Sequence, residues 1–270
     1  NPNAEVGYVH YALFDFDGTL SVIRHGWEEV MFAVMVESIC EEHPPTLEIE
    51  AEVAQFIDQS TGILTIKQMK WLEEAVRRHG MARRPKNAAA YKRIYLDRLL
   101  QLVRERLRVL DGSLEAGQSW LVAGAQNFLT KLAKRGVQLF LSSGTDQEYV
   151  LQEAEALGIV DFFKGCIFGA QGDSETDTKE MIIQRILTDY RLSGKELLVV
   201  GDGPVEIQSA RLAGSIALGV ACNETDRLSW DARKHQRLLQ AGADFIVSNF
   251  LHSSKLPKQG SYIHPGCAPT

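Results

Sequence analysis

Five short apolar runs lie along the chain, and each is continuous rather than alternating with polar residues. They are YALFDF (11–16), VQLFLS (137–142), ELLVVG (196–201), SIALGV (215–220) and DFIVSN (244–249). Continuous runs of this length are typical of parallel strands that are covered on both faces. Helical patterns lie between them, at 123–136, 177–192 and 204–215. Strands that alternate with helices predict an α/β fold with a doubly wound, Rossmann-like parallel sheet.

Residues 22 to 116 depart from this alternation. Four helical patterns follow one another there without a strand-like run between them, at 26–43, 48–60, 65–80 and 87–110. An insertion of this size can bury an apolar core of its own. We therefore expect a helical cap domain at 22–116 and an α/β core formed by 1–21 and 117–270. The last stretch, 251–270, is rich in Pro, Gly and Ser and is expected to wrap the surface or fray.

Polar residues stand where the predicted strands end. Asp15 and Asp17 close the first run, Ser143 closes the second, and Asp202 follows the run at 196–201. In doubly wound sheets, ligands bind beyond the carboxyl ends of the strands, so these groups are expected to meet at one edge. Asp15 and Asp17 are two residues apart, and Gly18 allows the chain to turn there so that both aspartates reach one site.

This set of residues suits phosphoryl transfer. Carboxylate oxygens are the ligands that Mg²⁺ prefers, together with water and substrate phosphate. Asp15 can attack phosphorus, and Asp17 can protonate the leaving alcohol and later deprotonate water. Mg²⁺, a serine hydroxyl and Lys179 would neutralise the charge on the transferring group. An alternative reading gives Asp202 and Glu206 only a structural role, capping the helix that begins at Pro204 and complementing its dipole.

The motifs resemble those of the haloacid dehalogenase superfamily, in the phosphatase branch with an α-helical cap that includes phosphoglycolate phosphatase and β-phosphoglucomutase. DFDGT matches the first family motif, which implies Asp15 as nucleophile and Asp17 as acid and base. LFLSSG resembles the second, which implies Ser143 and Gly144 as phosphate binders, with Ser142 as the less favoured register. The resemblance covers 8–21 and about 117–248, and it matches the cap only as a helical insertion.

Two further motifs complete the resemblance. Lys179 fits the third motif, as a phosphate-binding lysine. VVGDGPVEIQSARLAG resembles the fourth, which implies Asp202 as a Mg²⁺ ligand beside Asp15 and the backbone carbonyl of Asp17. The second acid of this motif is usually Asp, whereas here it is Glu206. We expect Glu206 to lie behind the direct ligands, and the sequence leaves open whether it touches the metal or acts through water.

The second aspartate also separates activities within the superfamily. Haloacid dehalogenases lack it, since a carbon–halogen bond needs no proton for its leaving group, so the presence of Asp17 disfavours dehalogenation. We therefore predict a Mg²⁺-dependent phosphatase that acts on a small phosphorylated metabolite, such as a sugar phosphate or a phosphoglycolate-like acid. A phosphomutase with the same aspartyl-phosphate and a non-catalytic phosphate-binding domain are the alternatives.

Charge and composition restrict the partners. The chain has 29 Lys and Arg against 35 Asp and Glu, a formal net charge of −6, which disfavours a nucleic-acid partner. No apolar stretch reaches the roughly 18–20 residues of a membrane span, and no signal peptide opens the sequence. We expect a cytoplasmic protein, monomeric or homodimeric. Its four scattered cysteines are expected to be reduced thiols: Cys40, Cys166, Cys222 and Cys267.

The cap offers only weaker candidates for substrate contacts. Arg24 follows the catalytic strand and could bind a second anionic group on the substrate, or it could be a solvated linker arginine. The stretch STGILTIKQ (60–68) resembles a turn between two helices, where this branch of the superfamily often carries a specificity loop. Thr61, Gly62 and Lys67 are its candidate residues.

Overall fold

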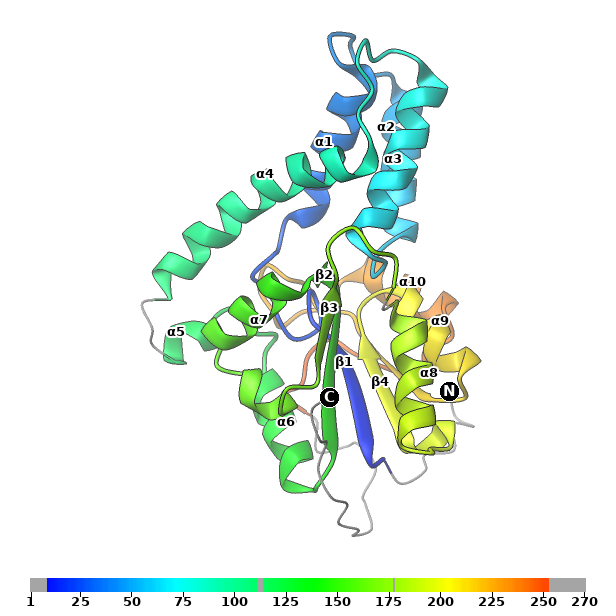
Figure 1. Ribbon diagram of the computed structural model, residues 1–270. Helices are drawn as coiled ribbons and strands as arrows, with labels where there is room; N and C mark the ends of the chain where they lie inside the picture. Colours follow the sequence, from blue (N-terminus) through cyan, green and yellow to red (C-terminus); the bar gives the residue numbers. More distant parts are fainter. Residues whose placement is uncertain (1–8, 111–113, 177, 253–270) are drawn as a thin grey trace.

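The computed structural model describes residues 9–110, 114–176 and 178–252. Within these ranges, six parallel strands form one sheet in the order β3-β2-β1-β4-β5-β6 (Figure 1). The strands are β1 (Tyr11–Asp15), β2 (Gln138–Asp146), β3 (Ile167–Ala170), β4 (Leu197–Gly201), β5 (Ile216–Val220) and β6 (Phe245–Val247). The predicted doubly wound, Rossmann-like fold is thus confirmed. Beyond residue 252, the tail at 251–270 lies outside the described ranges.

Helices cover both faces of the sheet. Ala12 and Phe14 of β1 belong to an apolar layer shared with helices α6 (Ala125–Lys134) and α7 (Gln147–Ala156). Tyr11 and Leu13 belong to the opposite layer, which is shared with α8 (Lys179–Asp189), α9 (Pro204–Leu212) and α10 (Ala232–Gln240). Because successive side chains of a strand point to opposite faces, the unbroken apolar run of β1 fills both layers.

The predicted helical patterns at 123–136, 177–192 and 204–215 correspond to α6, α8 and α9. Helix α8 begins where the Thr178 side chain accepts a hydrogen bond from the Met181 N–H, and Pro204 occupies the first turn of α9. Strand β3 and helices α7 and α10 were not predicted. Two 3₁₀ turns complete the core, η1 (Val160–Phe163) and η2 (Gly194–Glu196).

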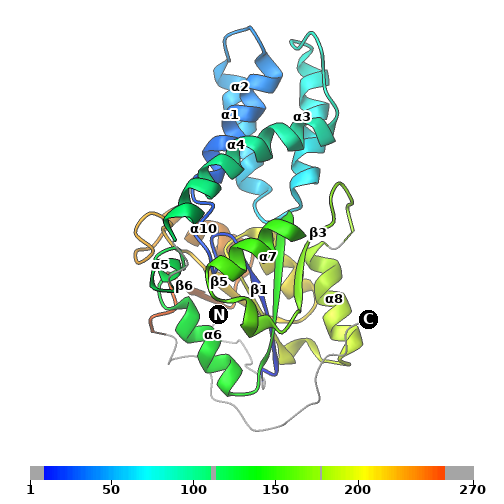
Figure 2. The same cartoon turned by 60° about the vertical axis from the view of Figure 1, so that its left-hand side comes forward.

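Four helices form the inserted segment, and they stand at the end of the sheet where β1 leaves it (Figures 1 and 2). They are α1 (Trp27–Cys40), α2 (Leu47–Gln59), α3 (Thr65–His79) and α4 (Ala88–Val109). Their buried side chains, among them Met35, Val53, Leu72 and Tyr91, form an apolar cluster of their own. The short helix α5 (Leu114–Gln118) then spans the proposed boundary between residues 116 and 117.

Polar contacts fasten these four helices to the rest of the molecule. On α4, the Lys92 ammonium is buried and lies 2.6 Å from the Asp146 carboxylate at the end of β2. The Arg106 guanidinium donates to the carbonyl of Ile23 at 2.6 Å. On the other side, the Arg237 side chain of α10 donates to the Thr61 hydroxyl at 3.1 Å. The helices are therefore held closely over the carboxyl ends of the strands.

Cys40, Cys166 and Cys222 are buried and carry reduced thiols, whereas Cys267 lies outside the described ranges. Among the helices of the described residues, none combines the length and apolar character needed to cross a bilayer.

Candidate active site

Asp15 ends β1 beneath the cap helices and is buried. Its carboxylate accepts hydrogen bonds from the Lys179 ammonium at 2.6 Å and from the Thr19 hydroxyl at 3.2 Å. The chain turns at Gly18, which has a φ of +72° that side chains other than glycine rarely adopt. A Cβ at Gly18 would also collide with the Asp202 carboxylate, so this glycine lets the end of β4 approach the end of β1.

Three buried carboxylates meet at this point. The side chains of Asp15, Asp202 and Glu206 offer oxygens that all lie within 4.8 Å of one another. Burial raises the pKa of Asp15 well above its usual value, against the lowering effect of the Lys179 ammonium. Burial likewise raises the pKa of Asp202. Close carboxylates that are costly to ionise, with hard oxygen donors only, fit a small divalent cation such as Mg²⁺.

Glu206 links the acidic cluster to the start of α9. One of its oxygens accepts the Gly203 N–H at 2.8 Å, and the other accepts a hydrogen bond from Lys179 at 3.1 Å. The Glu206 side chain, which is longer than that of the usual Asp, thus caps α9 and also reaches the acidic cluster. The structural role and the place in the cluster, which the sequence offered as alternatives, occur together.

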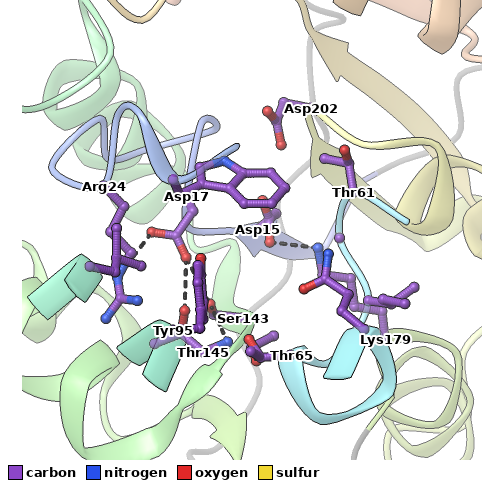
Figure 3. Close-up of a pocket in the computed structure, with 16 residues that line it drawn as sticks. Asp15, Asp17, Arg24, Thr61, Thr65, Tyr95, Ser143, Thr145, Lys179 and Asp202 are labelled. Carbon is purple, nitrogen blue, oxygen red and sulfur yellow. Dashed lines mark hydrogen bonds and ion pairs between the residues drawn. The ribbon is translucent and has the colours of Figure 1, made fainter. Parts of the chain in front are cut away.

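Asp17 lies apart from this cluster and in different surroundings. Its Oδ2 accepts hydrogen bonds from the hydroxyls of Ser143 and Thr145, both at 3.2 Å (Figure 3). Its Oδ1 is buried and has no hydrogen-bond partner among the described residues, with the Arg24 Nε at 3.7 Å. Burial raises the pKa of Asp17 to about 6, opposed by the Arg24 guanidinium. A carboxyl group with this pKa can both give and take a proton near neutral pH.

The structure distinguishes between the two serines at the end of β2. Ser142 pairs with Asp15 in the sheet register and does not line the cavity, whereas Ser143 does. Gly144 follows in the cavity wall, and a Cβ there would lie 2.5 Å from the carbonyl oxygen of Ile63. The absence of a side chain at Gly144 therefore allows the 60–64 loop to close over the end of β2.

These groups surround a cavity of about 60 Å³ between the sheet and the cap helices (Figure 3). Its lining includes six of the predicted core residues, namely Asp15, Asp17, Ser143, Gly144, Lys179 and Asp202. Helices α1, α3 and α4 and the loop at 60–64 supply the cover: Trp27, Thr61, Gly62, Ile63, Thr65, Gln68, Tyr95 and Leu99.

The candidate residues of the cap fall into two groups. Arg24, Thr61 and Gly62 line the cavity, and a Cβ at Gly62 would lie 2.5 Å from the Glu206 carboxylate. Lys67 instead lines a neighbouring cavity of about 140 Å³, which shares several lining residues with the first, namely Gly62, Ile63, Ser143, Gly144 and Lys179. The alternative reading of Arg24 as a solvated linker residue is wrong, because the residue is only 4% exposed.

Sequence reasoning missed several residues of the site. Thr145 lies two positions after Ser143 and so could have been found from the strand period. Lys234 of α10 gave no such signal, yet its ammonium lies 2.6 Å from both the Asp202 and the Glu224 carboxylates. Of the aromatic residues of α4, Tyr91 belongs to the apolar cluster of the four helices, whereas Tyr95 belongs both to that cluster and to the cavity wall.

A family model for haloacid dehalogenase-like hydrolases matches residues 9–214, about three quarters of the chain. The chain belongs to the haloacid dehalogenase-like hydrolases. Lys234 and Glu224 lie beyond the matched residues of this family. None of the curated protein sequences matches the chain.

Solved structures of haloacid dehalogenase-like fold are similar over most of the chain. A predicted phosphoglycolate phosphatase from Haemophilus somnus 129pt has a TM-score of 0.58 at 16% identity, covering 90% of this chain and 95% of that one. A β-phosphoglucomutase from Clostridium difficile has a TM-score of 0.57 at 14% identity, with 89% and 91% covered. A predicted phosphatase from Clostridium acetobutylicum has a TM-score of 0.56 at 16% identity, with 89% and 94% covered. At these identities the likeness concerns the fold.

Proposed function

We propose that this chain is a Mg²⁺-dependent phosphatase that hydrolyses a small phosphorylated metabolite through an aspartyl-phosphate on Asp15. The observation that carries the proposal is the contrast between two aspartates one residue apart. Asp15 lies in a cluster of acids beside Lys179, whereas Asp17 is held by two hydroxyls and has a pKa of about 6. Two carboxyl groups whose surroundings differ in this way suit different roles in catalysis.

In the first step, a carboxylate oxygen of Asp15 forms a bond to phosphorus while the bond from phosphorus to the leaving oxygen breaks. Asp17 donates its proton to that leaving oxygen, which departs as an alcohol. In the second step, Asp17 takes a proton from a water molecule as the water oxygen attacks phosphorus. The bond between Asp15 and phosphorus then breaks, so inorganic phosphate is released and both aspartates are restored.

Other residues of the chain would hold the charge of the transferring group. Lys179 and the Ser143 hydroxyl are placed to bind its oxygens, with the backbone at Gly144 beside them. When bound by Asp15, Asp202 and the backbone carbonyl of Asp17, Mg²⁺ would supply Lewis-acid stabilisation of the same charge. We further propose that residues 22–116 act as the cap that excludes water, over a catalytic core formed by 1–21 and 117–270.

The test is a panel of phosphorylated metabolites incubated with the protein in Mg²⁺ and in EDTA, with release of inorganic phosphate as the readout. We expect Mg²⁺-dependent release from at least one ester and none in EDTA. Release that EDTA does not affect, or no turnover of any ester, would contradict the proposal.

A phosphomutase is the second candidate, supported by the fold it shares with β-phosphoglucomutase. The same panel separates the two activities. A sugar phosphate that is converted to an isomeric ester without free phosphate would establish the mutase.

A further inference from the structure

Helices α1, α3 and α4 and the loop at 60–64 add no charge to the cavity wall among the described residues. One of their eight lining residues is Gly62, and the other seven have aromatic, aliphatic, hydroxyl-bearing or amide-bearing side chains. The two cations that line the same cavity are Lys179 and Arg24, and both are buried. Any selection for a charged leaving group must therefore come from one of these two cations.

Both cations are already neutralised by carboxylates. Lys179 lies 2.6 Å from Asp15 and 3.1 Å from Glu206, inside the acidic cluster. The Arg24 guanidinium donates from Nε to both carboxylate oxygens of Glu153, at 2.9 and 3.1 Å, and from Nη2 at 2.6 Å. The side chains of Arg24 and Glu153 are only 5% and 1% exposed, so water screens neither charge.

Glu153 is therefore a built-in counter-ion for the cation nearest the proposed acid. It projects from helix α7 of the core and does not line the cavity itself. Arg24, which it holds, faces the Asp17 oxygen that has no hydrogen bond. The leaving group must approach this side of the cavity, because Asp17 is to protonate it. A carboxylate or second phosphate on the leaving group would lose its hydration there. It would lie beside Asp17 with no unpaired cation to balance its charge.

We propose that Glu153 is a specificity-determining residue, which pairs with Arg24 and thereby restricts the enzyme to phosphate monoesters with an uncharged leaving group. The inference rests on the proposed phosphatase function and narrows its substrate class away from phosphoglycolate-like acids. Lys67 lines the neighbouring cavity, which adjoins the first at Ser143, Gly144 and Lys179 and not at Asp17 or Arg24, so it lies on the phosphate side and not on the side of the leaving group.

The test uses two esters of equal chain length, 2-hydroxyethyl phosphate and 2-phosphoglycolate, which differ in a hydroxymethyl group against a carboxylate. For the unmodified protein in Mg²⁺, we expect kcat/KM to be at least about 10-fold higher for the hydroxyethyl ester. Glu153→Gln leaves the Arg24 charge free, so the ratio should shift at least about 10-fold toward phosphoglycolate. Glu155→Gln, an exposed change on the same helix, is the matched control and should leave the ratio unchanged.

Each outcome decides the inference. A wild-type preference for phosphoglycolate, or an unchanged ratio in a folded Glu153→Gln variant, would overturn it. If Glu153→Gln does not fold, the wild-type ratio and the double variant R24Q/E153Q remain, and the double variant should keep the preference for the hydroxyethyl ester. If neither ester is hydrolysed, the proposed function fails for this pair. Calorimetric binding of the two esters then tests the selectivity separately, and tighter binding of phosphoglycolate would contradict it.

Discussion

The core and the cap contribute opposite kinds of residue to one cavity. The charged groups in its lining come from the core strands, the start of α8 and the segment just before α1, whereas helices α1, α3 and α4 and the loop at 60–64 add only uncharged side chains. Buried charges are costly unless they are paired, and the core pairs them with lysines and hydroxyls. The core thus supplies most of the charged groups that the proposed chemistry would use, and the helices and the loop over it supply an uncharged cover.

The largest effect is expected at the centre of the core. Asp15→Asn removes the proposed nucleophile, and we expect turnover of any substrate ester to fall by at least about 10⁴-fold. Far-UV circular dichroism and thermal unfolding should show an intact fold, because the change removes a charge from a crowded acidic cluster. Mg²⁺-dependent hydrolysis near the wild-type rate would exclude Asp15 as the nucleophile.

Asp17→Asn should lower kcat by about 10²–10⁴-fold while substrate binding changes little, because only proton transfer is lost. It should also raise stability above neutral pH. The folded pKa of Asp17, about 6, exceeds the ordinary value of 3.8 for an aspartate, so the stability that this group contributes is full below pH 4 and is lost as pH rises through 6. Ionised Asp17 thus costs the fold roughly 2–3 kcal/mol at pH 8.

Urea unfolding at pH 4.5 and at pH 8 measures this cost. The free energy of unfolding of Asp17→Asn should exceed that of the wild type at pH 8, and the difference should shrink toward pH 4.5. A difference that does not vary with pH would show that Asp17 has an ordinary pKa in the folded protein.

Lys234→Met tests how the core balances its buried acids. The change leaves Asp202 and Glu224 without their shared ammonium, so we expect a loss of about 3 kcal/mol in the free energy of unfolding in EDTA. Saturating Mg²⁺ should reduce this loss, since a bound cation also compensates Asp202. Arg233→Met, an exposed change on the same helix, should cost less than about 0.5 kcal/mol. Equal losses in the two variants would contradict this role of Lys234.

The smallest effect is expected in the cap wall. Tyr95→Phe removes a hydroxyl beside the cavity and should change kcat/KM by less than about 10-fold, because the lost group carries no charge. Tyr91→Phe is its matched control, since the Tyr91 hydroxyl accepts the Lys86 N–H at 3.1 Å and does not line the cavity. It should cost about 1 kcal/mol of stability and leave the kinetics unchanged. A larger kinetic effect at Tyr91 than at Tyr95 would show that the cap acts through its packing.

Much of the fold could be predicted because strands and helices here are local patterns of apolar residues. Five of the six strands in the described part of the chain appear as continuous apolar runs. Strand β3 is only four residues long and contains Gly169, so its run was too short to recognise. Helix α10 was missed because it is largely polar, and its buried side chains are Lys234 and Leu238.

The amino-acid sequence was enough to place the candidate polar residues beside the ends of predicted strands or at the start of a predicted helix: Asp15, Asp17, Lys179 and Asp202. Which buried charges are paired depends on tertiary packing and could not be predicted. Arg24 and Glu153 are 129 residues apart, and Asp202 meets Lys234 across 32 residues. Such pairs depend on where helices pack, and a neutralised cation has the same one-letter code as a free one.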